Sequence, residues 1–79
     1  MALKSDGKPM RALRYLATQT RPVYEADVWA ALSWRPKGEN IYWGDALRTL
    51  YKRGLAERHG EPGGFSYTIT DAGRDVLDA

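Results

Sequence analysis

A glycine- and proline-rich turn in the C-terminal third of the chain constrains the possible folds more than any other segment. The turn GEPGG, residues 60–64, separates two short runs with strand character, residues 55–59 and 65–69. In the second run apolar residues at 65, 67 and 69 alternate with hydroxyl residues at 66 and 68, the period of a half-buried strand. A five-residue loop between two such runs predicts a β-hairpin. We expect Gly63 or Gly64 to take a positive φ there, because glycine has no Cβ to clash.

Hydrophobic periodicity predicts two helices in the first half of the chain. The first begins at Pro9, which suits the first turn of a helix, and ends near residues 18–20. A short extended piece, Val23-Tyr24, leads into a second helix over about residues 25–33. The residues expected to share the inward face of this second helix are Tyr24, Val28, Ala31 and Leu32.

A third helix is predicted over residues 41–53, with Asn40 as its N-cap and Gly54 as its C-terminal stop. The residues expected to face inward are Trp43, Gly44, Leu47, Leu50 and Tyr51. A rotation of about 100° per residue places a polar set on the opposite face. That set is Tyr42, Asp45, Arg48, Thr49 and Lys52.

Thr70 is expected to cap a short last helix that folds back onto the core. The predicted core consists of Leu13, Leu16, Val28, Leu32, Leu47, Leu50, Leu55, Tyr67, Ile69 and Leu77. The combination of helices with a β-hairpin indicates the α+β class. With 79 residues the chain has room for one small core, so we expect one domain over residues 9–79, preceded by a flexible arm over residues 1–8.

Composition argues against several classes of function. The chain has no cysteine and a single histidine, His59, so we expect no disulfide and no zinc site. We find no nucleophile elbow, no phosphate-binding glycine loop and no paired carboxylates, and so expect neither an enzyme nor a cofactor. No apolar run is long enough to cross a membrane, and no apolar signal core follows the first lysines. We therefore expect a cytoplasmic protein.

Charge is distributed unevenly along the sequence. Up to residue 60 there are eleven Lys/Arg against six Asp/Glu, whereas residues 61–79 carry one arginine against four acidic residues. A basic body of this kind suggests an anionic partner, although an ordinary solvated surface would have the same composition.

The segment from Leu47 to Leu77 resembles the winged helix-turn-helix family of small bacterial and phage regulators. The likeness rests on "ALRTLYKRGLAER", the glycine-rich turn and "FSYTITDAGRDVL". The resemblance implies a three-helix helix-turn-helix core, a two-stranded hairpin called the wing, and a short C-terminal helix. It also implies a sequence-specific protein for double-stranded DNA, a transcriptional regulator such as a repressor, whose third helix enters the major groove.

The resemblance points to residues that could contact DNA through amide, hydroxyl, guanidinium and ammonium donors. On the third helix and its cap these are Asn40, Tyr42, Arg48, Thr49 and Lys52; flanking it are Arg35, Lys37, Arg53 and Arg58. We expect Arg48 to read a base and Lys52 to contact a phosphate. Asp45, on the same face, would accept from a cytosine amino group or pair with Arg48 or Thr49.

A second interpretation stays open at this stage. The acidic tail, a turn that carries Glu61 but no Lys or Arg, and the aromatic residues Trp29 and Trp34 favour a protein-interaction module, such as an inhibitor or an assembly factor. Exposed aromatics would also suit a homodimer. Binding that weakens steeply as salt rises would favour DNA over a protein partner.

Overall fold

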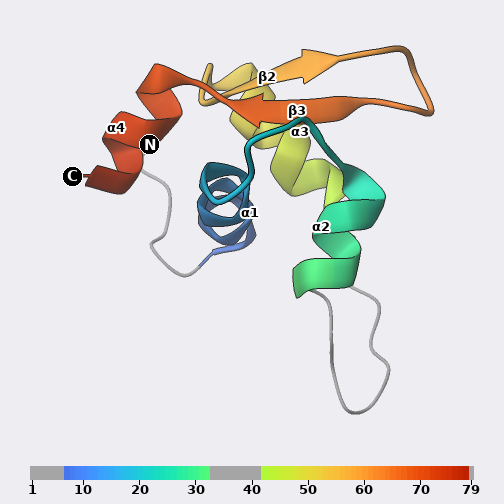
Figure 1. Ribbon diagram of the computed structural model, residues 1–79, viewed down its shortest axis with the longest axis horizontal. Helices are drawn as coiled ribbons and strands as arrows, with labels where there is room; N and C mark the ends of the chain where they lie inside the picture. The colour runs from blue at the N-terminus through green and yellow to red at the C-terminus, as the bar shows by residue number, and fades with distance from the viewer. Residues whose placement is uncertain (1–6, 33–41, 79) are drawn as a thin grey trace.

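Four helices and three short strands make up the part of the chain that the computed structural model describes, residues 7–32 and 42–78 (Figure 1). In chain order the elements are α1 (Lys8–Ala17), β1 (Val23–Tyr24), α2 (Glu25–Leu32), α3 (Gly44–Lys52), β2 (Ala56–His59), β3 (Ser66–Ile69) and α4 (Asp71–Asp78). Figure 1 shows α1, α2 and α3 on one side of the sheet, with α4 beside α1. The predicted α+β class is confirmed.

The three strands form one antiparallel sheet in the order β1-β3-β2. The predicted hairpin is present, and its second strand is the central one: β3 pairs with β2 from Ala56↔Ile69 to His59↔Ser66, and with β1 at Val23↔Tyr67. The short extended piece before α2 is therefore a true strand. Because Val23 and Tyr67 are both buried, this pairing closes the sheet over the helices.

Most of the predicted core is buried. The fully enclosed side chains include Leu13 and Leu16 of α1, and Leu47 and Leu50 of α3, so these two helices pack against each other beneath the sheet. Leu32, Ile69 and Leu77 are only partly buried but pack against the same cluster. Trp43 is 1% exposed, which confirms its place in the core.

The start of α3 differs from the prediction. The helix begins at Gly44, not at residue 41, and its N-cap is Trp43, whose carbonyl accepts the first helical bond from Leu47 at 3.0 Å. The predicted N-cap, Asn40, lies outside the described residues. The Trp43 ring is buried at this N-cap. Tyr42 therefore precedes the helix.

Three further expectations about inward-facing residues were wrong. Tyr24 is 52% exposed, because it lies in β1 and does not follow the helical spacing of α2; Ala31 is exposed as well. Tyr51 is 41% exposed at the edge of the buried stripe of α3. Near the start of the chain, Lys8 belongs to α1 and not to an arm.

The hydroxyl of Thr70 makes two hydrogen bonds where the hairpin meets α4. Thr70 Oγ1 accepts from the Gly73 N–H at 3.1 Å, which confirms the predicted cap, and it donates to the Gly54 carbonyl at 2.8 Å. Gly54 follows α3 with a φ of 75°, the conformation expected of a helix stop. Thr70 thereby links the start of α4 to the end of α3.

The turn of the hairpin holds two glycines in the left-handed region, Gly60 with a φ of 95° and Gly63. Gly63 has a φ of 90°, as predicted for one of the two neighbouring glycines, and the Gly64 N–H donates to the Glu61 carbonyl at 2.9 Å. Gly64 itself does not have a positive φ, and a Cβ there would meet only the Glu61 oxygen at 3.9 Å.

Alanine substitutions at these two glycines should therefore differ. Gly63→Ala is expected to lower the free energy of unfolding by about 1–2 kcal/mol, the usual penalty for a Cβ in the left-handed region. Gly64→Ala, the matched control, should stay within about 0.5 kcal/mol of wild type. Urea unfolding followed by tryptophan fluorescence measures both, and equal losses for the two variants would contradict this account of the turn.

Candidate functional site

The solvent-facing side of α3 carries the main candidate site. Because Leu47 and Leu50 point into the core, the opposite side of the helix presents Asp45, Arg48 and Lys52 to solvent, with Thr49 half-buried beside them. These residues line an open groove of about 370 Å³. The complete lining is Tyr42, Gly44, Asp45, Arg48, Thr49 and Lys52. Four of the predicted contact residues thus lie around one groove.

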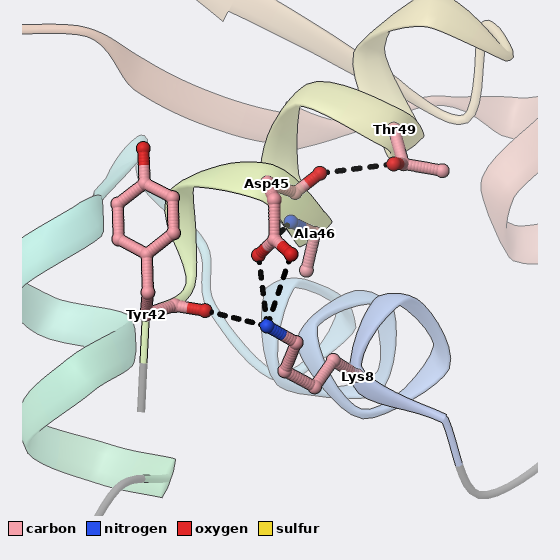
Figure 2. A network of polar contacts seen from close by, with 5 residues as sticks. All are labelled: Lys8, Tyr42, Asp45, Ala46 and Thr49. Atoms are coloured by element: carbon pink, nitrogen blue, oxygen red, sulfur yellow. Dashed lines mark hydrogen bonds and ion pairs between the residues drawn. The ribbon is translucent and has the colours of Figure 1, made fainter. Parts of the chain in front are cut away.

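Tyr42 joins this groove from outside the helix. Its side chain is 66% exposed, and its ring occupies the space that a side chain at position 44 would fill. A Cβ at Gly44 would clash with the ring, so the glycine allows the tyrosine to lie against the first turn of α3. The phenol, drawn in Figure 2, belongs to the lining of the groove and can donate or accept a hydrogen bond.

Asp45 is held by a residue distant in the sequence. The Lys8 ammonium donates to both Asp45 carboxylate oxygens at 3.0 Å and to the Tyr42 carbonyl at 2.8 Å (Figure 2). The sequence predicted Arg48 or Thr49 as the alternative partner of this carboxylate, and that expectation was wrong. Thr49 Oγ1 instead donates to the Asp45 backbone carbonyl at 2.9 Å.

The two cationic side chains of the groove, Arg48 and Lys52, are available to bind an external ligand. Neither Arg48 nor Lys52 forms a hydrogen bond or an ion pair with another of the described residues, and both are exposed. Their donors therefore need no internal bond to be broken before they bind an external acceptor. Because the Asp45 charge is paired with Lys8, the free charge of this groove is positive.

Arg58, predicted as a phosphate contact, also has a structural role. Its guanidinium carbon lies 4.1 Å from the ring centre of Tyr51 and 4.2 Å from that of Phe65. Tyr51 is in the last turn of α3, and Phe65 immediately precedes β3. This pair of cation–π contacts connects the hairpin to the C-terminal end of α3 and explains why Tyr51 stays at the surface.

The other predicted contact residues are more dispersed. Arg53 is exposed at the C-cap of α3, next to the groove in sequence but not among its lining residues. Arg35 and Lys37, like Asn40 and Trp34, lie outside the described residues. His59 is bonded through Nε2 to Thr68 Oγ1 at 2.9 Å, which ties it to the neighbouring strand.

Lys8 is the residue that sequence reasoning missed. It stands 37 positions before Asp45, in the segment that the sequence predicts to be a flexible arm. A lysine just before a helix-starting proline carries no local signal for a partner on another helix. Only the packing of α1 against α3 brings the two side chains together.

Other kinds of site find no support among residues 7–32 and 42–78. No three histidine, aspartate or glutamate side chains in this part of the chain are grouped to hold a metal ion. None of the helices found there is both long and apolar enough to cross a membrane.

Comparisons with models of protein families, with curated proteins and with solved structures find no match to the chain. Function therefore has to be argued from the chemistry of the groove and from the arrangement of the elements around it.

The contact of Arg58 with two rings leads to a stability prediction. Arg58→Met keeps much of the side-chain stem but removes the charge, and should lower the free energy of unfolding by about 1 kcal/mol. Glu57→Gln, on the same strand and without a partner among the described residues, is the control and should have little effect. Urea unfolding followed by tryptophan fluorescence provides the measurement. Coincident unfolding curves for Arg58→Met and wild type would contradict a stabilising role.

Proposed function

We propose that this chain is a sequence-specific double-stranded DNA-binding protein, a small transcriptional regulator that places α3 in the major groove. The observation that carries the proposal is the exposed groove of α3, where Arg48, Thr49 and Lys52 lie together while the opposite side of the helix is locked in the core. A major groove about 12 Å wide admits an α-helix, so a rigid helix with donors on its free side suits this ligand.

Each side chain of the groove has a suitable partner on DNA. Arg48 lies near the middle of α3, and its free guanidinium matches the two acceptors that guanine presents in the major groove. Lys52 is in the last turn, nearer the basic end of the helix, and suits a phosphate. The Tyr42 hydroxyl can bond to either bases or phosphates. The Thr49 hydroxyl donates to the Asp45 carbonyl and can accept from a base.

The arrangement of the elements supports the same proposal. A three-helix core, a hairpin after the third helix and a strand between the first two helices are what a winged helix would provide. In Figure 1 the loop between β2 and β3 extends past α2 and α3, as a wing would. Because its tip carries exposed Glu61, the proposal assigns the principal contacts to α3 and not to the tip.

One observation favours the alternative, a protein-interaction module without specific DNA binding. Tyr24 and Trp29, which are 52% and 48% exposed, lie in β1 and α2, outside the α3 groove. Exposed aromatics of this size are common anchors in protein interfaces. Their separation from the α3 groove makes the two functions separable by mutation.

The proposal is tested by fluorescence-anisotropy titration of a duplex selected from a random library and of a scrambled duplex. Arg48→Ala should cost about 1–3 kcal/mol on the selected duplex and relax the preference at one base pair. Lys52→Ala should weaken binding to both duplexes alike and reduce the salt slope by about one unit.

Two controls complete this experiment. Arg74→Ala removes an exposed arginine of α4, and Trp29→Ser removes the exposed indole of α2; both should leave the affinity for DNA unchanged. Wild-type protein that shows no affinity for duplex DNA at low salt, or DNA binding that is insensitive to both α3 variants, would overturn the proposal. The protein-interaction alternative would then take its place.

A further inference from the structure

Asp45 poses a problem for any groove that binds an anion. Its side chain is 58% exposed and lies among the same lining residues as Arg48 and Lys52. A free carboxylate at that place would repel the phosphates that the two cations attract. The residue must therefore be neutralised or be directed at the bases, which present hydrogen-bond donors as well as acceptors in the major groove.

Lys8 neutralises this carboxylate and also fixes its position. An ammonium group has three N–H donors, and Lys8 directs its nitrogen at three acceptors: the two Asp45 oxygens and the Tyr42 carbonyl. The two oxygens of one carboxylate lie too close together to take separate N–H groups of one ammonium, so they share one N–H and one donor is left over. The contacts of Lys8 in the structure all go to Asp45 and Tyr42, and they define it as a positioning residue.

Asp45 nevertheless keeps some capacity to accept. A carboxylate offers about four lone-pair positions. Oδ1 accepts from Lys8 and from the Ala46 N–H at 2.8 Å, whereas Oδ2 accepts from Lys8 alone. One position on Oδ2 thus has no partner among the described residues, on a side chain that lines the α3 groove. Asp45 and Arg48 lie three residues apart on one side of α3 and are not bonded to each other, so they can address neighbouring bases.

We infer that Lys8 and Asp45 act together as a specificity-determining pair. Asp45 accepts a hydrogen bond from the exocyclic amino group of a cytosine next to the base that Arg48 reads, and Lys8 holds the carboxylate in place while cancelling its repulsion of phosphate. This inference rests on the proposed function, since it names the chemistry that the α3 groove would select.

The test is a set of anisotropy titrations with wild type, K8M, D45A and the double variant K8M/D45A. The duplexes are the selected site and the same site with each base pair changed in turn. D45A should lose about tenfold discrimination at a single C·G pair, because the acceptor for the amino group is gone. D45N, which keeps the side-chain size, should shift the preference at that pair towards adenine, the usual partner of an amide.

The double variant separates positioning by Lys8 from direct phosphate contact. K8M should weaken binding to every duplex by about fivefold, because Asp45 is left as an unpaired negative charge in the groove. That loss should disappear when K8M is combined with D45A. Thermal unfolding of each variant shows whether it is folded. If D45A is not folded, D45N replaces it in these titrations.

Two results would overturn the inference while leaving the proposed function intact. One is an unchanged base preference in both D45A and D45N, although R48A still weakens binding. The other is a K8M loss of the same size in the D45A background, which would make Lys8 a phosphate contact. Absence of any duplex binding by the wild-type protein would instead overturn the proposed function, and this inference with it.

Discussion

The orientation of α3 about its own axis determines which of its side chains are buried and which are exposed to solvent. Leu47 and Leu50 are fully enclosed against α1 and the sheet, and Trp43 is buried at the N-cap. A single helix of nine residues that buries this stripe has only one side left for solvent. A different rotation would expose leucines and bury Arg48 and Lys52 without partners, at a cost of several kcal/mol.

Both ends of α3 are then fixed by contacts that involve cations. At the N-terminal end, Lys8 bonds to Asp45 and to the Tyr42 carbonyl, and so joins the first turn of α1 to the first turn of α3. At the C-terminal end, Arg58 covers the ring of Tyr51, and Thr70 bonds to the Gly54 carbonyl. The groove is therefore held on a helix that is attached to its neighbours at both ends, which favours a ligand that binds without rearrangement.

Local patterns in the sequence predicted the helices, the hairpin, the positive φ of Gly63 and most of the core, because these depend on spacing and on turn chemistry. The start of α3 was wrong by three residues, because periodicity cannot show that Trp43 would be used as the N-cap. Helical spacing predicts that Tyr51 faces inward, because it lies only about 40° from Leu47 around the helix. Its contact with Arg58 comes from packing between elements. The partnership of Lys8 and Asp45 spans 37 residues and depends on tertiary structure alone.

The central claim is that the exposed side of α3 is the surface that meets DNA. Its most direct test is an NMR titration of the ¹⁵N-labelled protein with the duplex selected from a random library. The account predicts that the largest amide shift changes lie in residues 42–52, with smaller changes in the hairpin and little change over residues 24–29 of β1 and α2. Largest changes over residues 24–29 with none over residues 42–52 would contradict the claim.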